Sequence, residues 1–249
     1  MTGTHLNKSA RGFTLIEIAV AVVVIALLLG SILVPLATQV EQRQISDTQK
    51  ILDNIKEALV GFALTNGYLP CPDKTSGSST PPNDVPNDGN EDFSAAGTCI
   101  AAEGGNVPWA TLGVGNTDAW GNRFRYRVDT DFARRSPATT FTLTTGAGLR
   151  VCTTAACTVS LTSSTSGNGA AAVILSHGKN GLGAINSLTN STNPAPTSAD
   201  ELENTDGNAT FVSRVATPTG AAAGEFDDIV SWLSKYTLFN RMVAAGKLP

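Results

Sequence analysis

The sequence predicts an α+β protein in which one long N-terminal helix packs against an antiparallel β-sheet. Three observations support this fold: an uncharged apolar run over residues 18–40, an apolar helical face that continues to residue 62, and short β-branched segments further on. With 249 residues, the chain has room for one folded domain or two small ones. A formal net charge of −4 argues against a nucleic-acid-binding protein, because such proteins need a basic surface.

The uncharged run 18–40 would measure about 35 Å as a helix, which is enough to cross the roughly 30 Å apolar core of a bilayer. Lys8 and Arg11 precede this run, so the positive-inside rule places the N-terminus in the cytoplasm. A removable secretory signal and a plain membrane anchor are the two ordinary interpretations. The run is too long for a signal, no clear A-x-A cleavage site follows it, and neither interpretation explains Glu17, whose carboxylate is costly in an apolar span.

The residues around Glu17 carry a resemblance to a known family. A basic leader, Gly12, Phe13 and the run 14–17, followed by a long apolar helix, resemble the leader junction of type IV prepilins and type II secretion pseudopilins. The resemblance implies that a prepilin peptidase cleaves between Gly12 and Phe13 and that Phe13 is then N-methylated. It also implies that Glu17 of one subunit pairs with the Phe13 amine of a neighbour, which would satisfy an otherwise unpaired carboxylate.

The helical pattern continues beyond the apolar run. Apolar side chains recur every three or four residues and define one face of a helix: Ile45, Leu52, Ile55, Leu59 and Phe62, with Thr48 in the same stripe. Asn66-Gly67 is a helix-ending signal, so one helix of about 80 Å is expected from residue 13 to residue 65. Pro35 interrupts this pattern and favours a kink, which is ordinary in a transmembrane helix.

Downstream segments are rich in β-branched residues and are separated by glycine-containing turns, as expected for strands. The candidate strands are 124–128, 141–144, 149–151, 159–161, 171–176 and 211–215. Residues 228–233 suit either a strand or the start of a helix, whereas 235–245 suit a short helix. With the resemblance, the chain divides into a leader (1–12), a transmembrane or filament-core half-helix (13–40), an amphipathic half-helix (41–66) and a periplasmic head (67–249).

The four cysteines all follow the apolar run, so the expected topology places them in an oxidising periplasm. Their spacing suits no common zinc site, and three disulfide connectivities are open. We favour Cys71–Cys99 and Cys152–Cys157, because each bridge joins neighbours in the sequence. The first bridge would close a polar loop over residues 74–92, and the second would close a tight hairpin.

Other segments resemble the calcium-binding regions of major pseudopilins. Residues 118–122 resemble their Asp-x-Trp-Gly-Asn signature, and residues 176–181 and 225–229 resemble their calcium-binding loops. No cofactor is required, but the resemblance implies a calcium site that involves Ser176, Asn180, Asp227 and Asp228, since calcium prefers oxygen ligands. Asn180 stands where those proteins usually carry Asp, and a turn beside exposed acids is the ordinary alternative. Residues 201–206 are interpreted as solvated acids.

Enzymatic activity is not expected, because the sequence contains no G-x-S-x-G, H-E-x-x-H, Walker A or G-x-G-x-x-G motif. His177 is interpreted as a solvent-facing or turn histidine, and neighbouring Ser176 cannot form a catalytic pair with it if both lie on a strand. We therefore expect a structural protein. A single-span periplasmic enzyme or ligand-binding protein is the alternative from another class.

The expected role is that of a minor subunit of a type IV pilus or a type II secretion pseudopilus. Its partners would be the prepilin peptidase and methyltransferase, other pilin subunits, the assembly platform and the inner membrane, with no nucleic acid. The chain would cross the inner membrane once before assembly and lie in the filament afterwards. A tip adhesin or DNA-uptake pilin is the runner-up, although the acidic head gives no electrostatic support for DNA binding.

Overall fold

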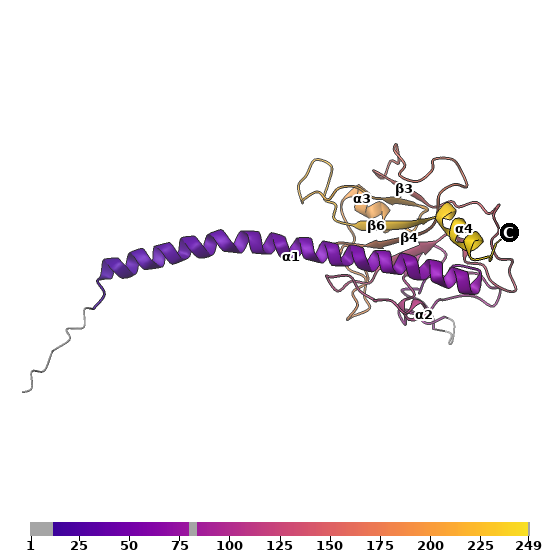
Figure 1. Ribbon diagram of the computed structural model, residues 1–249, viewed down its shortest axis with the longest axis horizontal. Helices are drawn as coiled ribbons and strands as arrows, with labels where there is room; N and C mark the ends of the chain where they lie inside the picture. Colours follow the sequence, from indigo (N-terminus) through magenta and orange to yellow (C-terminus); the bar gives the residue numbers. More distant parts are fainter. Residues whose placement is uncertain (1–11, 80–83, 249) are drawn as a thin grey trace, which may run out of the picture. The chain divides into compact units, whose positions relative to one another are not determined.

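The computed structural model describes residues 12–79 and 84–248, except for the side chains of residues 29–36. The chain forms two compact units, Met1–Arg43 and Gln44–Pro249. Helix α1 (Leu15–Asn66) contributes its first part to one unit and its second part to the other (Figure 1). The basic leader residues Lys8 and Arg11 lie outside the described residues.

Helix α1 is only partly apolar along its length. In the first unit its described large apolar side chains, such as Leu15 and Leu27, are exposed. Among the residues that the structure describes, no helix is both long enough and apolar enough to cross a membrane. Pro35, where a kink is expected, falls among the residues whose side chains are not described.

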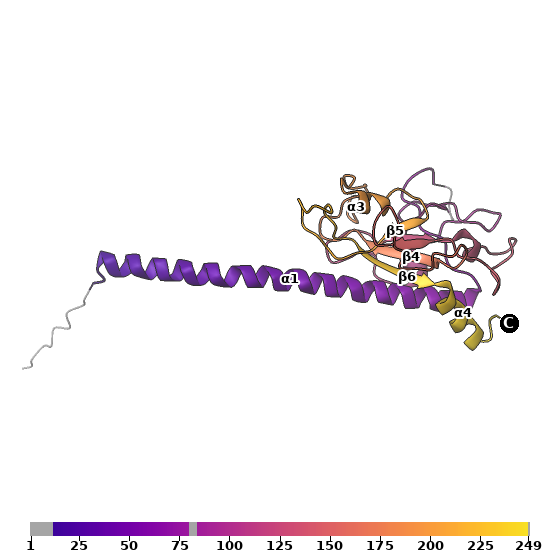
Figure 2. The ribbon, with the colours of Figure 1, turned by 90° about the horizontal axis from the view of Figure 1, so that it is seen from above.

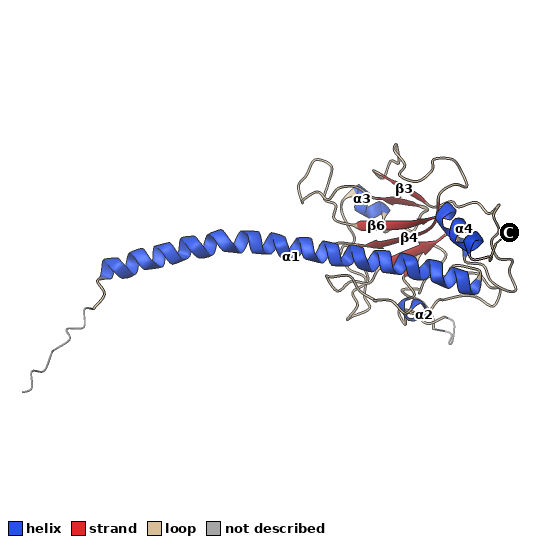
Figure 3. Cartoon of the chain, in the orientation of Figure 1, coloured by secondary structure: helices blue, strands red, loops and turns tan. Residues whose placement is uncertain are grey.

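The second unit contains a four-stranded antiparallel sheet, which confirms the predicted helix-plus-sheet class (Figure 3). Its strand order is β1 (Gly105–Asn106), β2 (Arg125–Val128), β4 (Ala170–Ser176) and β6 (Ile229–Ser234). All of β4 is buried, because this central strand lies between neighbours and is covered on both faces. The shorter helical elements are α2 (Trp109–Leu112), the 3-10 turn η1 (Thr130–Phe132), α3 (Ala199–Glu203) and α4 (Lys235–Ala244).

Beside the predicted antiparallel sheet there is a second, two-stranded sheet that the sequence does not predict. Strands β3 (Arg150–Cys152) and β5 (Thr210–Val212) form a separate pair and run parallel to each other. Parallel strands need a long crossover, which here includes β4 and α3. The ambiguous segment 228–233 is resolved as β6, and the predicted C-terminal helix is present as α4.

Two predicted strands are absent from the described residues. In 141–144, Phe141 packs against Phe132 and Phe239, and the Thr145 amide donates to the Thr142 carbonyl 3.0 Å away, which closes a turn instead. In 159–161, only Ser160 makes a β-bridge, with Cys152. β-branched composition alone cannot distinguish such turns from strands, because pairing depends on partners elsewhere in the chain.

The second half of α1 packs on the sheet through the predicted apolar face. Leu52, Ile55 and Leu59 are fully buried and share one core with Tyr126 and Leu238. Figures 1 and 2 show this half of the helix running beside β4, β6 and α4. The three-and-four spacing therefore predicts the packing face correctly.

Thr48 is the polar member of that face. It is completely buried, and its hydroxyl oxygen accepts a hydrogen bond from the backbone amide of Ala119 at 3.3 Å, which ties the 118–122 loop to α1. Thr48→Val keeps the shape but leaves this amide without its partner, so we expect a loss of about 1 kcal/mol in the free energy of unfolding. Urea denaturation measures this loss, with Thr48→Ser as the control that retains the hydroxyl. Equal stability of Thr48→Val and the unmodified chain would contradict the assigned role.

Both favoured disulfides are present: Cys71 is bonded to Cys99, and Cys152 to Cys157. The first closes the polar 74–92 loop, which is organised around two buried carboxylates rather than an apolar core. Asp73 accepts from the amides of Asn87 and Gly89 at 2.9 and 3.2 Å, and Asp92 accepts from the Lys74 amide at 2.7 Å. Burial raises the pKa of Asp73 to about 7, although hydrogen bonds from the Asn106 side chain and the Gly89 amide lower it.

Candidate functional site

The first candidate site is the junction between the leader and α1. Gly12, Phe13 and Thr14 are not helical, and the Phe13 side chain is 84% exposed. Glu17 Oε2 accepts from both the amide and the hydroxyl of Thr14 at 2.8 Å, while the Glu17 amide donates to Thr14 Oγ1 at 3.3 Å. This reciprocal arrangement is a capping box. In the single chain, the Glu17 carboxylate therefore caps its own helix.

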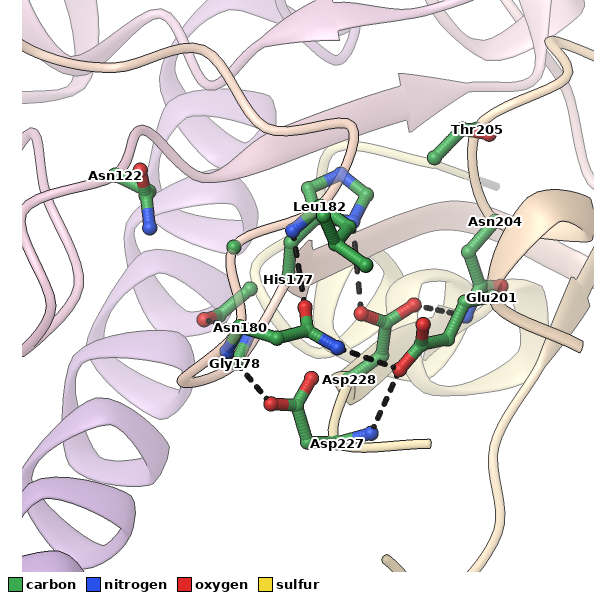
Figure 4. A network of polar contacts seen from close by, with 12 residues as sticks. Asn122, His177, Gly178, Asn180, Leu182, Glu201, Asn204, Thr205, Asp227 and Asp228 are labelled. Atoms are coloured by element: carbon green, nitrogen blue, oxygen red, sulfur yellow. Dashed lines mark hydrogen bonds and ion pairs between the residues drawn. The ribbon is translucent and has the colours of Figure 1, made fainter. Parts of the chain in front are cut away.

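The second candidate site is a cluster of three carboxylates near one end of the sheet. Glu201 comes from α3, and Asp227 and Asp228 directly precede β6. One oxygen atom from each residue can be chosen so that all three lie within 4.8 Å of one another. Glu201 is only 2% exposed and Asp228 is also buried. Figure 4 shows the three carboxylates gathered beside Asn180 and His177.

The turn after β4 holds the cluster from one side. The Asn180 amide donates to Asp227 Oδ2 at 2.7 Å, and Asn180 Nδ2 donates to Glu201 Oε1 at 3.1 Å (Figure 4). Gly178 has φ +58°, and a Cβ there would lie 2.5 Å from Asp227 Oδ1, so only glycine fits. The turn can approach the acids this closely because a residue without a side chain stands at position 178.

The remaining contacts leave two carboxylate oxygens unused. The Asp227 amide donates to Glu201 Oε1 at 3.1 Å, and Asn204 Nδ2 donates to Asp228 Oδ2 at 2.7 Å. Among the described residues, neither Glu201 Oε2 nor Asp227 Oδ1 has a hydrogen-bond partner, although both atoms are buried. Buried anionic oxygens without partners are costly, and either a bound cation or a bound proton would lower this cost.

The electrostatics of the cluster agree with this geometry. Burial, followed by repulsion from Asp228, raises the pKa of Glu201 to about 7. Burial is also the largest cause that raises the pKa of Asp227, to about 6. An oxygen-rich anionic site of this kind suits a hard cation such as Ca²⁺, which is held by carboxylate and carbonyl oxygens. Without a cation, the same site takes up protons near neutral pH.

Comparison with known proteins identifies the N-terminal region. Residues 7–33 match the family described as the prokaryotic N-terminal methylation motif. The chain carries a type IV prepilin-like leader. No curated protein and no solved structure is significantly similar to the chain. The match therefore identifies only the leader and the start of α1. The function of the head is inferred from its own geometry.

In the head, the structure brings together part of the predicted calcium set. Asp227 and Asp228 lie side by side in the cluster, and Asn180 contacts it through its backbone and side-chain nitrogens. The Asn180 side-chain oxygen accepts from the Leu182 amide at 2.9 Å instead. Ser176 Oγ donates to Asp118 Oδ2 at 2.7 Å, so its hydroxyl belongs to a neighbouring network.

That neighbouring network explains the 118–122 signature. Asp118 is buried, and its Oδ1 accepts from the amides of Trp120 and Asn122 at 3.0 and 2.9 Å. A carboxylate that accepts hydrogen bonds from the amides two and four residues ahead stabilises the turn that those residues form. Burial raises the pKa of Asp118 even though the Ser176 hydroxyl bond opposes the shift. Asp118 thus fixes the turn and joins it to the end of β4.

Two residues that could have faced solvent are buried. The interpretation of Glu201 as a solvated acid is wrong, because α3 turns it inward to the other two carboxylates. His177 opens a turn, as one of its two interpretations has it, since its carbonyl accepts from the Gly181 amide at 3.0 Å; it does not face solvent, because it is 1% exposed, with Nδ1 3.5 Å from Asp228 Oδ1. No local pattern reveals either position, because burial there depends on distant residues: Glu201 meets Asp227 26 positions away, and His177 meets Asp228 about fifty positions away.

Proposed function

We propose that this chain is a structural subunit of a type IV pilus or a type II secretion pseudopilus, in a minor rather than a bulk position. The observation that carries the proposal is the prepilin-like leader, in which Phe13 follows Gly12 and Glu17 lies near the start of an apolar helix. The large head with its long loops supports the minor position. No catalytic activity is proposed for it.

The capping box suggests how assembly would use Glu17. Cleavage after Gly12 would convert the Phe13 amide into an amine, whose pKa in model compounds is about 8, and N-methylation would retain the positive charge. The Glu17 carboxylate could then exchange its bond to Thr14 for the charged amine of a neighbouring subunit. Because an ion pair in a low-dielectric stem is far stronger than in water, this exchange would favour the filament.

The state of the mature N-terminus tests the proposal directly. We expect mass spectrometry of the chain, purified from its native membranes, to find N-methylated Phe13 as the first residue and no residues 1–12. A charged, bulky substitution such as Gly12→Glu should leave the leader attached, because Gly12 is the residue at the cut. Recovery of an intact Met1 from the unmodified chain, together with absence from sedimented filaments, would contradict the proposal.

The same proposal includes the cellular location. The chain would be anchored in the inner membrane through residues 13–40, with the head in the periplasm, and would then move into the filament. Two disulfides in the head agree with an oxidising compartment. The expected partners are the prepilin peptidase and methyltransferase, other subunits and the assembly platform.

A specific observation also favours calcium binding by the head. We propose that Glu201, Asp227 and Asp228 hold one Ca²⁺, because two of their buried oxygens lack any described hydrogen-bond partner. Asn180 and the backbone near Ser176 would hold the turn against the ion. Isothermal titration of the full chain with calcium chloride tests the site. Glu203→Gln is the matched control, since Glu203 lies on the same helix outside the cluster.

A further inference from the structure

A cavity of about 270 Å³ lies on the face of the sheet opposite α1. Two arginines, Arg123 and Arg125, reach it from the start of β2, and His177 reaches it from the end of β4. Ile185, Ala195 and Pro196 form an apolar part of its wall. The cavity is separate from the carboxylate cluster, although His177 contacts both of them.

The alternation of β2 directs the two arginines away from the core. Phe124 and Tyr126 are buried in the core that includes α1, so Arg123 and Arg125 project from the opposite face. Arg125 is paired with Leu175 in the antiparallel register of β2 and β4. The Arg123 amide instead donates to the Ile185 carbonyl at 2.9 Å, and the side chains of Arg123, Arg125 and His177 all line the one cavity.

Among the described residues, neither guanidinium group contacts a carboxylate, although Arg123 is buried and Arg125 is half-buried. Arg123 is 6% exposed; its Nη2 donates to Asn190 Oδ1 at 2.7 Å and its guanidinium lies 4.0 Å from the Trp109 ring centroid. In the described part of the chain, Nε and Nη1 of Arg123 and Nε of Arg125 have no hydrogen-bond partner. Nor does any carboxylate oxygen of that part lie within 4.0 Å of either guanidinium.

The nearest acids do not neutralise this charge by contact. Asp73 attracts Arg123 and Asp206 attracts Arg125, but only through longer-range interaction. Burial is the main cause that lowers the pKa of both guanidinium groups, which remain cationic because the ordinary arginine pKa is so high. A cation with no anionic partner in contact is expensive where it is poorly solvated, and an anion in the cavity would offset the charge of both arginines.

We propose that this cavity binds a small organic oxyanion, with its acid group on Arg123 and Arg125 and its carbon skeleton against Ile185, Ala195 and Pro196. Guanidinium groups suit this task because their fixed N–H groups match the two oxygens of a carboxylate or phosphate. The volume falls just below the roughly 300–1,000 Å³ of typical small-molecule pockets, so the ligand is of monosaccharide rather than polymer size. The head thereby gains a ligand site that does not depend on filament assembly.

Titration calorimetry of the full chain in neutral detergent, at low ionic strength and with EDTA, tests this proposal. The probes are glucuronate, glucose 6-phosphate and glucose, which share a sugar ring and differ in the acid group. We expect one or both anionic sugars to bind at least about tenfold more tightly than glucose, since the charge-assisted hydrogen bonds are absent from glucose. The two anionic arms show whether the cavity prefers a carboxylate or a phosphate.

Variants identify the residues that bind. Arg125→Gln should weaken anion binding at least about tenfold while the melting temperature without ligand stays nearly equal, because half-buried Arg125 has no carboxylate partner to lose. Arg125→Lys, which retains the charge, should lose less affinity, and Arg134→Gln removes an exposed arginine as the control. The proposal would be overturned if glucose bound as tightly as glucuronate and glucose 6-phosphate, or if no probe bound. It would also be overturned if both Arg125 variants bound the anions with full affinity.

Discussion

A Glu17→Gln chain is expected to be cleaved and methylated normally but to be lost from filaments. Glutamine retains the length of glutamate and can still accept from Thr14, because either residue serves in a capping box. It cannot form an ion pair with the charged amine of a neighbour. Leaving one partner of a buried pair alone costs about 3–5 kcal/mol, which corresponds to a hundredfold or greater loss of incorporation.

Thr14→Ala is the matched control for this experiment. It removes the hydroxyl that bonds Glu17 at 2.8 Å and weakens the helix cap by about 1 kcal/mol, but it leaves the carboxylate charged. Quantitative immunoblots of sheared filaments, normalised to the processed membrane pool, would compare the two variants. Normal incorporation of Glu17→Gln, or an equal loss in Thr14→Ala, would show that Glu17 acts through the helix cap and not through its charge.

The features that the sequence predicts well are local ones. The apolar stripe through Leu52, Ile55 and Leu59 needs only the helical period, and the favoured disulfides needed only proximity along the chain. The leader junction is a contiguous motif, and comparison with known proteins confirms it. Each of these depends on residues close together in the sequence.

The features that sequence reasoning missed are non-local. Strands β3 and β5 pair in parallel across a crossover that contains β4. No short segment of the sequence predicts this pairing. Glu201 resembles any surface acid in the sequence, but α3 folds it against Asp227. Arg125 resembles any outward residue of an alternating strand, but residues 183–196 form a cavity beside it. Polar residues become functional candidates here only through tertiary burial, which composition and spacing do not specify.

If the carboxylate cluster binds calcium as proposed, stability should depend on both pH and calcium. In EDTA, the free energy of unfolding should fall as pH rises from about 5 to 8. Glu201 has a pKa of about 7 when folded and 4.5 as its ordinary value, so across that window the folded chain holds a proton that the unfolded chain releases. Stability gained from this proton is complete below pH 4.5 and is lost as pH rises through 7, by about 3 kcal/mol.

Asp227 has a folded pKa of about 6 and shifts stability in the same direction. Asp73 lies outside the cluster, has a folded pKa of about 7 and has the same effect. Calcium should restore stability at pH 8, because it binds the ionised cluster of the folded chain; at a hundredfold excess over its Kd the gain is about 2.7 kcal/mol. Asp73 should retain its pH dependence whether or not calcium is present, since it lies outside the cluster.

Chemical denaturation at several pH values, with EDTA or with calcium, measures these effects. Glu201→Gln should be more stable than the unmodified chain at pH 8 in EDTA, because it removes a buried charge, and should gain little from calcium. Glu203→Gln should behave like the unmodified chain. If calcium leaves the pH 8 stability of the unmodified chain unchanged while Glu201→Gln flattens the pH dependence, the cluster holds protons and no calcium. If neither change has an effect, the burial of Glu201 has no energetic consequence and the site itself is wrong.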